Sequence, residues 1–184
     1  MNANLLPTGS AYFLTPQTQA EERHTLTVLV DNEPGVLARV VGLFSARGFN
    51  IDSLTVSETE HDKHRSRITV VTVATPKILA QVKLQLERLV PVHKVHDLTE
   101  EGSAIERELA LVKVAGAGDS RVEALRLADA FRAQVIDATT ESFVFEITGR
   151  ASKIEQFVTL MMPLGLVEVV RTGMAAITRG PEGM

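Results

Sequence analysis

Cysteine and tryptophan are both absent from this chain of 184 residues, which contains one tyrosine and seven phenylalanines. Without cysteine there are no disulfides, no thiolate metal ligands and no cysteine nucleophile, a composition compatible with a reducing cytosol. A surface that stacks nucleobases needs exposed aromatic rings, and we expect these few rings to be taken by hydrophobic cores. The formal net charge of -4 gives no reason for bulk attraction to nucleic acid or to anionic membranes.

Long apolar runs are missing as well, since no uninterrupted stretch approaches the roughly 20 residues that a membrane-spanning helix needs. The N-terminal segment lacks a basic start and its apolar pieces are interrupted by Pro7, Gly9 and Pro16, which is unlike a signal peptide. Residues 1–22 are rich in Thr, Gln, Asn and Pro, and we expect them to form a poorly ordered extension. The protein is therefore predicted to be cytoplasmic, with neither membrane nor nucleic acid as a partner.

Strand-like and helix-like apolar patterns alternate through the first half of the chain, residues 23–98. Leu26, Val28 and Val30 recur at every second position, as in a half-buried strand. The expected elements are a strand at 24–31, a helix after Pro34-Gly35, strands at 50–58 and 66–74, a helix opened by Thr75-Pro76, and a strand at 92–98.

The second half, residues 106–172, repeats the same order. Its expected elements are strands at 106–115, 134–140, 141–149 and 166–172, with helices around 124–131 and 154–161. Ser120 with Glu123 and Ser152 with Glu155 have the spacing of capping boxes at the two helix starts. The order βαββαβ in each half predicts an α+β protein of two ferredoxin-like domains in tandem. Residues 99–105 are expected to be a linker and residues 173–184 a tail.

A sheet covered by helices on one face leaves its other face in need of cover. A domain of about 75 residues buries only about 60% of its surface, so leaving an apolar sheet face exposed would make it only marginally stable. Leu29, Val71 and Val73 are apolar at positions on that second face. We therefore expect a homodimer that joins the sheets by an edge or a face.

The start of the first helix has the features of an anion site. The first amides of a helix have no intrahelical acceptor, and the helix dipole adds partial positive charge there. Gly35 has no side chain to keep a ligand away, and Asn50 offers both a carbonyl oxygen and an NH2 group. A free amino acid has the matching carboxylate and ammonium groups. The same residues also fit a simple helix entry and a turn residue, so the residues alone leave both interpretations open.

The stretch LVDNEPGVLARVVGLFSARGFNIDSLTV, residues 29–56, resembles the ACT domain, a ligand-sensing module whose DNEPGVL loop contacts amino acids. GLFSARGFNIDSLTV, with SRITVVT and IERELALVKV behind it, is similar to the small, regulatory subunits of acetolactate synthase (acetohydroxyacid synthase). The similarity runs from about Arg23 to Gly180 and includes IDATTESFVFEITG and EVVRTGMAAITRG.

This resemblance implies that the first domain dimerises edge to edge and binds valine between the two copies. One subunit would contribute Asn32, Gly35, Val36 and Leu37, and its partner Asn50 and Ile51. The chain would hold no cofactor and no catalytic residue, because a separate large catalytic subunit carries thiamine diphosphate, Mg2+ and FAD. The small subunit would raise the activity of that subunit in branched-chain amino acid biosynthesis and make it sensitive to feedback by valine.

The sequence allows four other interpretations. A free-standing amino-acid sensor for another enzyme or regulator would have the same site and a different partner. An independent enzyme would need a convergent acid, base or nucleophile, and the sequence supplies no convincing set. A metal site is disfavoured, because His93 and His96 fall on opposite faces of their strand and His61 and His64 fall in a polar turn. The turn at Gly116–Gly118 offers a weaker second anion site, for which a plain turn is the preferred interpretation.

Overall fold

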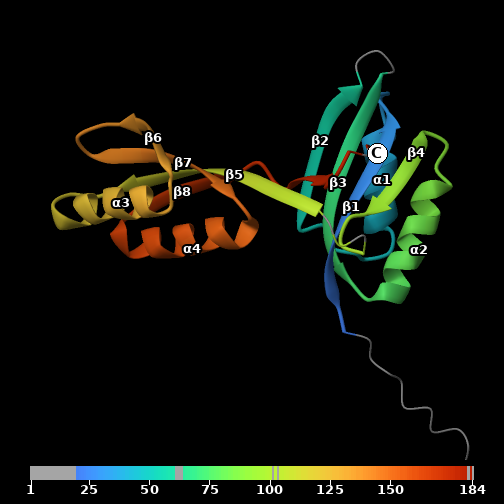
Figure 1. The fold of residues 1–184 in the computed structure, drawn as a ribbon, viewed down its shortest axis with the longest axis horizontal. Coiled ribbons are helices and arrows are strands. Elements are labelled where there is room, and N and C mark those ends of the chain that lie inside the picture. Colours follow the sequence, from blue (N-terminus) through green and yellow to red (C-terminus); the bar gives the residue numbers. More distant parts are fainter. Residues whose placement is uncertain (1–19, 61–63, 101, 103, 182, 184) are drawn as a thin grey trace, which may run out of the picture.

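The computed structural model describes residues 20–60, 64–100, 102, 104–181 and 183 (Figure 1). Its first half is a four-stranded antiparallel sheet in the order β2-β3-β1-β4, with two helices on one face. The elements are β1 (Glu22–Asp31), α1 (Val36–Ser45), β2 (Ser53–Glu60), β3 (Arg65–Ala74), α2 (Pro76–Glu87) and β4 (Val92–Asp97). This confirms the predicted order, and α2 begins where predicted, with Thr75 as N-cap and Pro76 in the first turn.

The second half repeats this arrangement with sheet order β6-β7-β5-β8. Its elements are β5 (Ala104–Ala115), α3 (Asp119–Ala130), β6 (Gln134–Ala138), β7 (Ser142–Gly149), α4 (Ala151–Met161), a 3-10 turn (Met162–Leu164), β8 (Leu166–Arg171) and β9 (Ala175–Thr178). The α+β fold class and the tandem of ferredoxin-like units are thus confirmed. No helix in the described part of the chain is long and apolar enough to cross a membrane.

The helix starts of the second half differ from the expected capping boxes. Gly118 is the N-cap of α3 and Arg150 the N-cap of α4, and neither makes a side-chain cap hydrogen bond. Both helices start two residues earlier than the serines suggest, so Ser120 and Ser152 already lie within a helix. The Glu155 carboxylate is used elsewhere, in a 3.2 Å ion pair with Arg171.

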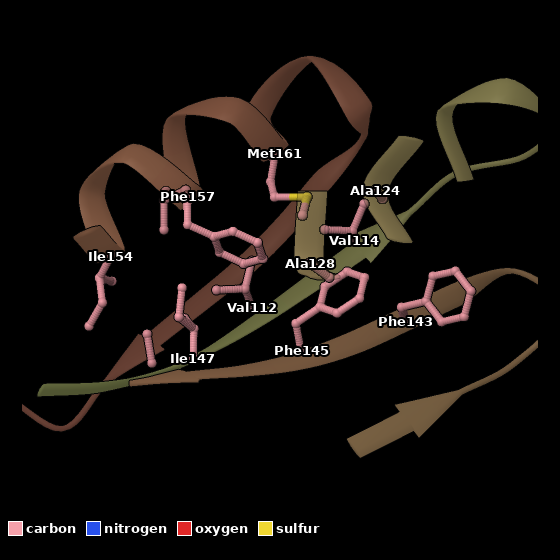
Figure 2. Packing of buried hydrophobic residues seen from close by; sticks show 12 residues of the cluster. Val112, Val114, Ala124, Ala128, Phe143, Phe145, Ile147, Ile154, Phe157 and Met161 are labelled. Carbon is pink, nitrogen blue, oxygen red and sulfur yellow. The ribbon is translucent and has the colours of Figure 1, made fainter. Parts of the chain in front are cut away.

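Each half has its own hydrophobic core between sheet and helices. In the first, Leu26, Val28 and Val30 are at most 1% exposed and pack with helix residues such as Phe44 and Leu86. In the second, the aromatic rings are concentrated in the core, as Figure 2 shows. Phe157 of α4 lies between two other rings, with centroid distances of 5.5 Å to Phe131 and 6.1 Å to Phe145.

The linker and the tail are more structured than expected. β5 begins at Ala104, inside the expected linker, and β9 lies inside the expected tail. The two pair antiparallel, Ala104 opposite Thr178 and Arg107 opposite Ala175, while the later part of β5 pairs with β7 and β8. A strand of four residues has too short a pattern to be recognised locally, and its partner lies about seventy residues away in the chain.

This ribbon of β5 and β9 reaches the first domain and lies over the face of its sheet opposite the helices (Figure 1). The Thr25 hydroxyl donates a 2.5 Å hydrogen bond to the Glu106 carboxylate, and Thr27 and Ala176 line the same small cavity. Val71 is fully buried and Leu29 only 3% exposed within a single chain, whereas Val73 remains 41% exposed. The chain therefore covers by itself most of the face for which we expected a partner.

The core of the second half predicts a sharp contrast along α4. Phe157→Ala removes a fully buried ring at the centre of the aromatic cluster and should lower the free energy of unfolding by about 3–5 kcal/mol. Leu160→Ala on the same helix, at a side chain that is 42% exposed, should cost less than about 1 kcal/mol. Urea unfolding followed by circular dichroism measures both, because the chain has no tryptophan. Equal losses for the two variants would contradict the assigned packing.

Candidate amino-acid site

The loop between β1 and α1 places the first four predicted site residues. Gly35 is the N-cap of α1 with φ 86° and ψ -8°, in the left-handed region that glycine adopts at least cost. Apart from its chain neighbours, a Cβ added at Gly35 would meet no atom within 4 Å, so the space beside this residue is open. The amide of Asn32 donates a 2.7 Å hydrogen bond to the His64 carbonyl, which fixes the loop beside the start of β3.

The N-terminus of α1 has amides to offer. The first helical hydrogen bond runs from the Arg39 amide to the Gly35 carbonyl at 3.1 Å, and the Val36 amide bonds back to Glu33 at 3.3 Å. The amides of Leu37 and Ala38 therefore precede any intrahelical acceptor, and no side chain caps the helix. The partial positive charge of the helix end adds to these donors, and a carboxylate is the natural acceptor.

The two apolar residues of this loop have different surroundings. Val36 is 4% exposed and belongs to the core of the first domain, whereas Leu37 is 41% exposed. Of the two, Leu37 is the side chain available to a ligand, and Val36 serves to anchor the helix start. The sequence pattern did not distinguish them, since both fit one apolar stripe.

Asn50 and Ile51 lie just before β2. The Asn50 side chain is exposed, and its Nδ2 donates a 2.6 Å hydrogen bond to Oδ1 of Asp52. Its main-chain carbonyl accepts a 2.6 Å hydrogen bond from the hydroxyl of Thr72 on β3. Ile51 is half-buried and packs against the core of the first domain. The contact of Asp52 with the Asn50 carboxamide joins residues two apart in a turn, and such a contact leaves no periodic signal in the sequence.

The two groups of predicted site residues do not meet within one chain. Asn32 is bonded to His64 before β3, and Asn50 to Thr72 near the end of that strand. At the rise of an extended strand, the stretch from His64 to Thr72 spans roughly 25 Å. A small ligand cannot touch both groups of one molecule, so a site that uses both needs the second group from another copy.

The histidines proposed as possible metal ligands do not converge within the described part of the chain. His93 Nε2 lies 2.6 Å from Asp31 Oδ1 at the surface, and His61 lies outside the described residues. Within residues 20–60, 64–100 and 104–181 no group of three potential metal ligands converges. The second candidate anion site is also unfavourable, because Asp119 places a carboxylate in the first turn of α3.

Comparison with known proteins agrees with both halves of the fold. Residues 26–94 match the family model described as the AHAS small subunit-like ACT domain, and residues 107–180 match that of the small subunit of acetolactate synthase. The chain is 46% identical over 158 residues to a probable acetolactate synthase small subunit of Archaeoglobus fulgidus, covering 86% of this chain and 98% of that protein. It is 45% identical over 161 residues to the small subunit of Mycobacterium bovis, with coverages of 88% and 95%.

A solved structure gives the same answer. The acetolactate synthase small subunit from Thermotoga maritima superimposes with a TM-score of 0.78 at 38% identity, over 88% of this chain and 99% of that one. The fold and the matched family model together define an ACT-domain protein, whose first domain has the ferredoxin-like arrangement. Its second domain specifies the branch of that class: the chain belongs to the family of acetolactate synthase small subunits.

Proposed function

We propose that this chain is the regulatory subunit of acetolactate synthase, which binds valine and transmits its presence to a separate catalytic subunit. The observation that carries the proposal is the N-terminus of α1 at Gly35, which has no side-chain cap hydrogen bond and where an added Cβ would meet nothing within 4 Å. The names of the relatives support the large subunit of acetolactate synthase as the partner, in preference to another enzyme or regulator. Thiamine diphosphate, Mg2+ and FAD are assigned by this proposal to the catalytic chain.

Valine would be held by its two charged groups and its branched side chain. Its carboxylate accepts from the amides of Leu37 and Ala38, where the helix end favours negative charge. Its ammonium donates to the side-chain oxygen Oδ1 of Asn50 from a second copy, because the NH2 group of that carboxamide is bonded to Asp52. Leu37 of one copy and Ile51 of the other contact the isopropyl group. One methylene changes affinity by only about 1–3 kcal/mol in such a pocket, so leucine and isoleucine are weaker competitors rather than excluded ligands.

A homodimer formed through β2 supplies this geometry. β2 is an edge strand of the first sheet, so one side of it is free to pair among the described strands. Antiparallel pairing of two β2 strands around a two-fold axis sets the Glu60 end of one beside the Ser53 end of the other. The first end adjoins the loop of Asn32 and the second adjoins Asn50. The exposed Leu37 and Val56, at 41% and 46%, support an apolar contact at this edge.

Inhibition then follows from linkage. A ligand shifts an equilibrium only by binding one arrangement better than another, and that preference is the coupling free energy between the sites. Valine shared by two copies favours the arrangement in which both halves of the site are correctly spaced. The catalytic subunit senses that arrangement through its contact with the small subunits.

Substitution of Gly35 tests the carboxylate site. Gly35→Asp places a negative charge beside the helix start and should weaken valine binding at least about tenfold, with loss of inhibition. Gly35→Asn has the same shape and the same left-handed strain without the charge, and it should lose clearly less affinity. Calorimetry with valine and inhibition of the reconstituted enzyme measure both variants. Unchanged valine sensitivity of Gly35→Asp would refute the assigned site.

Reconstitution tests the partner. Added to the large subunit of acetolactate synthase, the chain should raise the rate of acetolactate formation, and valine should reverse that gain more effectively than leucine or isoleucine. The chain alone should form no acetolactate. Turnover without the large subunit, or failure to stimulate and to co-purify with it, would contradict the proposed role and favour an enzyme or a free-standing sensor.

A further inference from the structure

The first residues of β2 also hold the C-terminal part of the chain. The main-chain amide of Met174 donates a 2.7 Å hydrogen bond to the Ser53 hydroxyl, and its carbonyl accepts a 2.8 Å hydrogen bond from the Thr55 hydroxyl. Ser53 and Thr55 are two positions apart, so they project from the same face of the strand. Met174 is 2% exposed. One residue between β8 and β9 thus has both its main-chain N–H and its main-chain carbonyl bound by β2.

The neighbouring residue is in tight contact with the same strand. Gly173 has φ 82°, and an added Cβ would lie 2.8 Å from the Ser53 hydroxyl oxygen and 3.0 Å from the Thr55 methyl carbon. No side chain fits between this connection and β2 without displacement. We call the contact of residues 173–174 with Ser53 and Thr55 the β2 latch.

The latch is adjacent in sequence to the proposed effector contact. Asp52 accepts the hydrogen bond from the Asn50 carboxamide, and its own amide donates to the Val71 carbonyl at 2.8 Å. Any ligand that engages Asn50 therefore acts on a residue bonded directly to Asp52, and the latch begins one residue later. Coupling over such a distance needs no long chain of intermediates.

The two domains are not fully packed against each other beside the latch. Asp52 and Ser53 line a cavity of about 470 Å³, whose opposite wall includes Glu108 and Arg171 of the second domain. In that wall Arg171 makes hydrogen bonds of 2.8 and 2.7 Å to the nearly buried Glu108 carboxylate, and these bonds raise the pKa of Arg171 above its ordinary value. The cavity gives the second domain room to change its position when the latch changes.

We propose that residues 50–55 form the coupling element that links occupancy of the amino-acid site to the position of the second domain through the β2 latch. This inference rests on the proposed function, since it assigns to Asn50 the role of an effector contact. Engagement of Asn50 shifts the start of β2, and the hydroxyls of Ser53 and Thr55 carry that shift to Met174. Without the latch the two domains respond independently, so valine still binds and no longer inhibits fully.

A pair of matched substitutions isolates the latch. Ser53→Ala combined with Thr55→Val removes both hydroxyls and nearly preserves volume, and Thr25→Val removes a β1 hydroxyl that binds the ribbon of β5 and β9, at Glu106. Thr25 lies on β1, separated from β2 by β3, and makes no bond of the latch, so its variant serves as the control. In the complex with the large subunit, the double variant should keep its valine dissociation constant within about threefold and lose at least about half of the maximal inhibition. Thr25→Val should keep wild-type inhibition.

The outcomes separate the latch from the proposed function. Absence of valine binding by the wild-type chain would refute the site itself. Wild-type inhibition in the double variant would refute the latch and leave the proposed function intact. A loss of valine affinity beyond about tenfold would also refute the latch, because residues 53–55 would then be part of the binding site. If the double variant does not fold, two single variants test the latch. Thr55→Ser keeps the hydroxyl and should retain inhibition, whereas Thr55→Val removes it and should reduce inhibition.

Discussion

The proposed site depends on the N-terminus of α1, where no side chain of the described residues makes a cap hydrogen bond. Gly35 turns the chain through a left-handed conformation, and α1 begins with its first amides directed away from any intrahelical partner. Unpaired amides at a helix start are normally satisfied by a capping side chain or by water. Here the loop supplies no cap and no Cβ, so the position is suited to an exogenous carboxylate. The other residues of the proposed site would bind the ammonium and the side chain of a ligand whose carboxylate these amides hold.

The proposed site needs residues from two copies of the chain, because its two groups of residues lie far apart within one copy. β3 separates the loop of Asn32 from Asn50 by nearly its whole length, because each is bonded to an opposite end of that strand. In the proposed dimer, a two-fold axis at the β2 edge would bring opposite ends together, so one small ligand would touch two copies. Such an arrangement would couple binding to the relation between the subunits. The β2 strand would then belong to the proposed dimer contact, the proposed effector site and the proposed latch.

Much of this architecture was predictable from the sequence because its signals are local. The alternation of Leu26, Val28 and Val30 and the stripe through Val40 and Phe44 each reflect contacts with one core, and the elements follow. Gly35 and Asn50 were identified by residue type and by resemblance to a known family.

The features missed by the sequence analysis depend on contacts between distant residues. β9 pairs with the start of β5, Met174 fits against β2, and neither has a periodic pattern of its own. The apolar residues Leu29, Val71 and Val73 led us to expect a second molecule on that face, but Leu29 and Val71 are already buried within a single chain. The different surroundings of Val36 and Leu37 could not be predicted either, because the apolar pattern does not tell a buried apolar residue from an exposed one.

The shared site can be tested most directly by complementation between two inactive chains. Gly35→Asp and Asn50→Ala each destroy one half of the site, so homodimers of either variant should bind no valine. A mixed dimer combines the intact loop of one chain with the intact Asn50 of the other and regains one site. Random pairing of co-expressed chains should then restore about a quarter of the wild-type number of sites by calorimetry. No restored binding in the mixture, or full binding by either variant alone, would contradict a site divided between two copies.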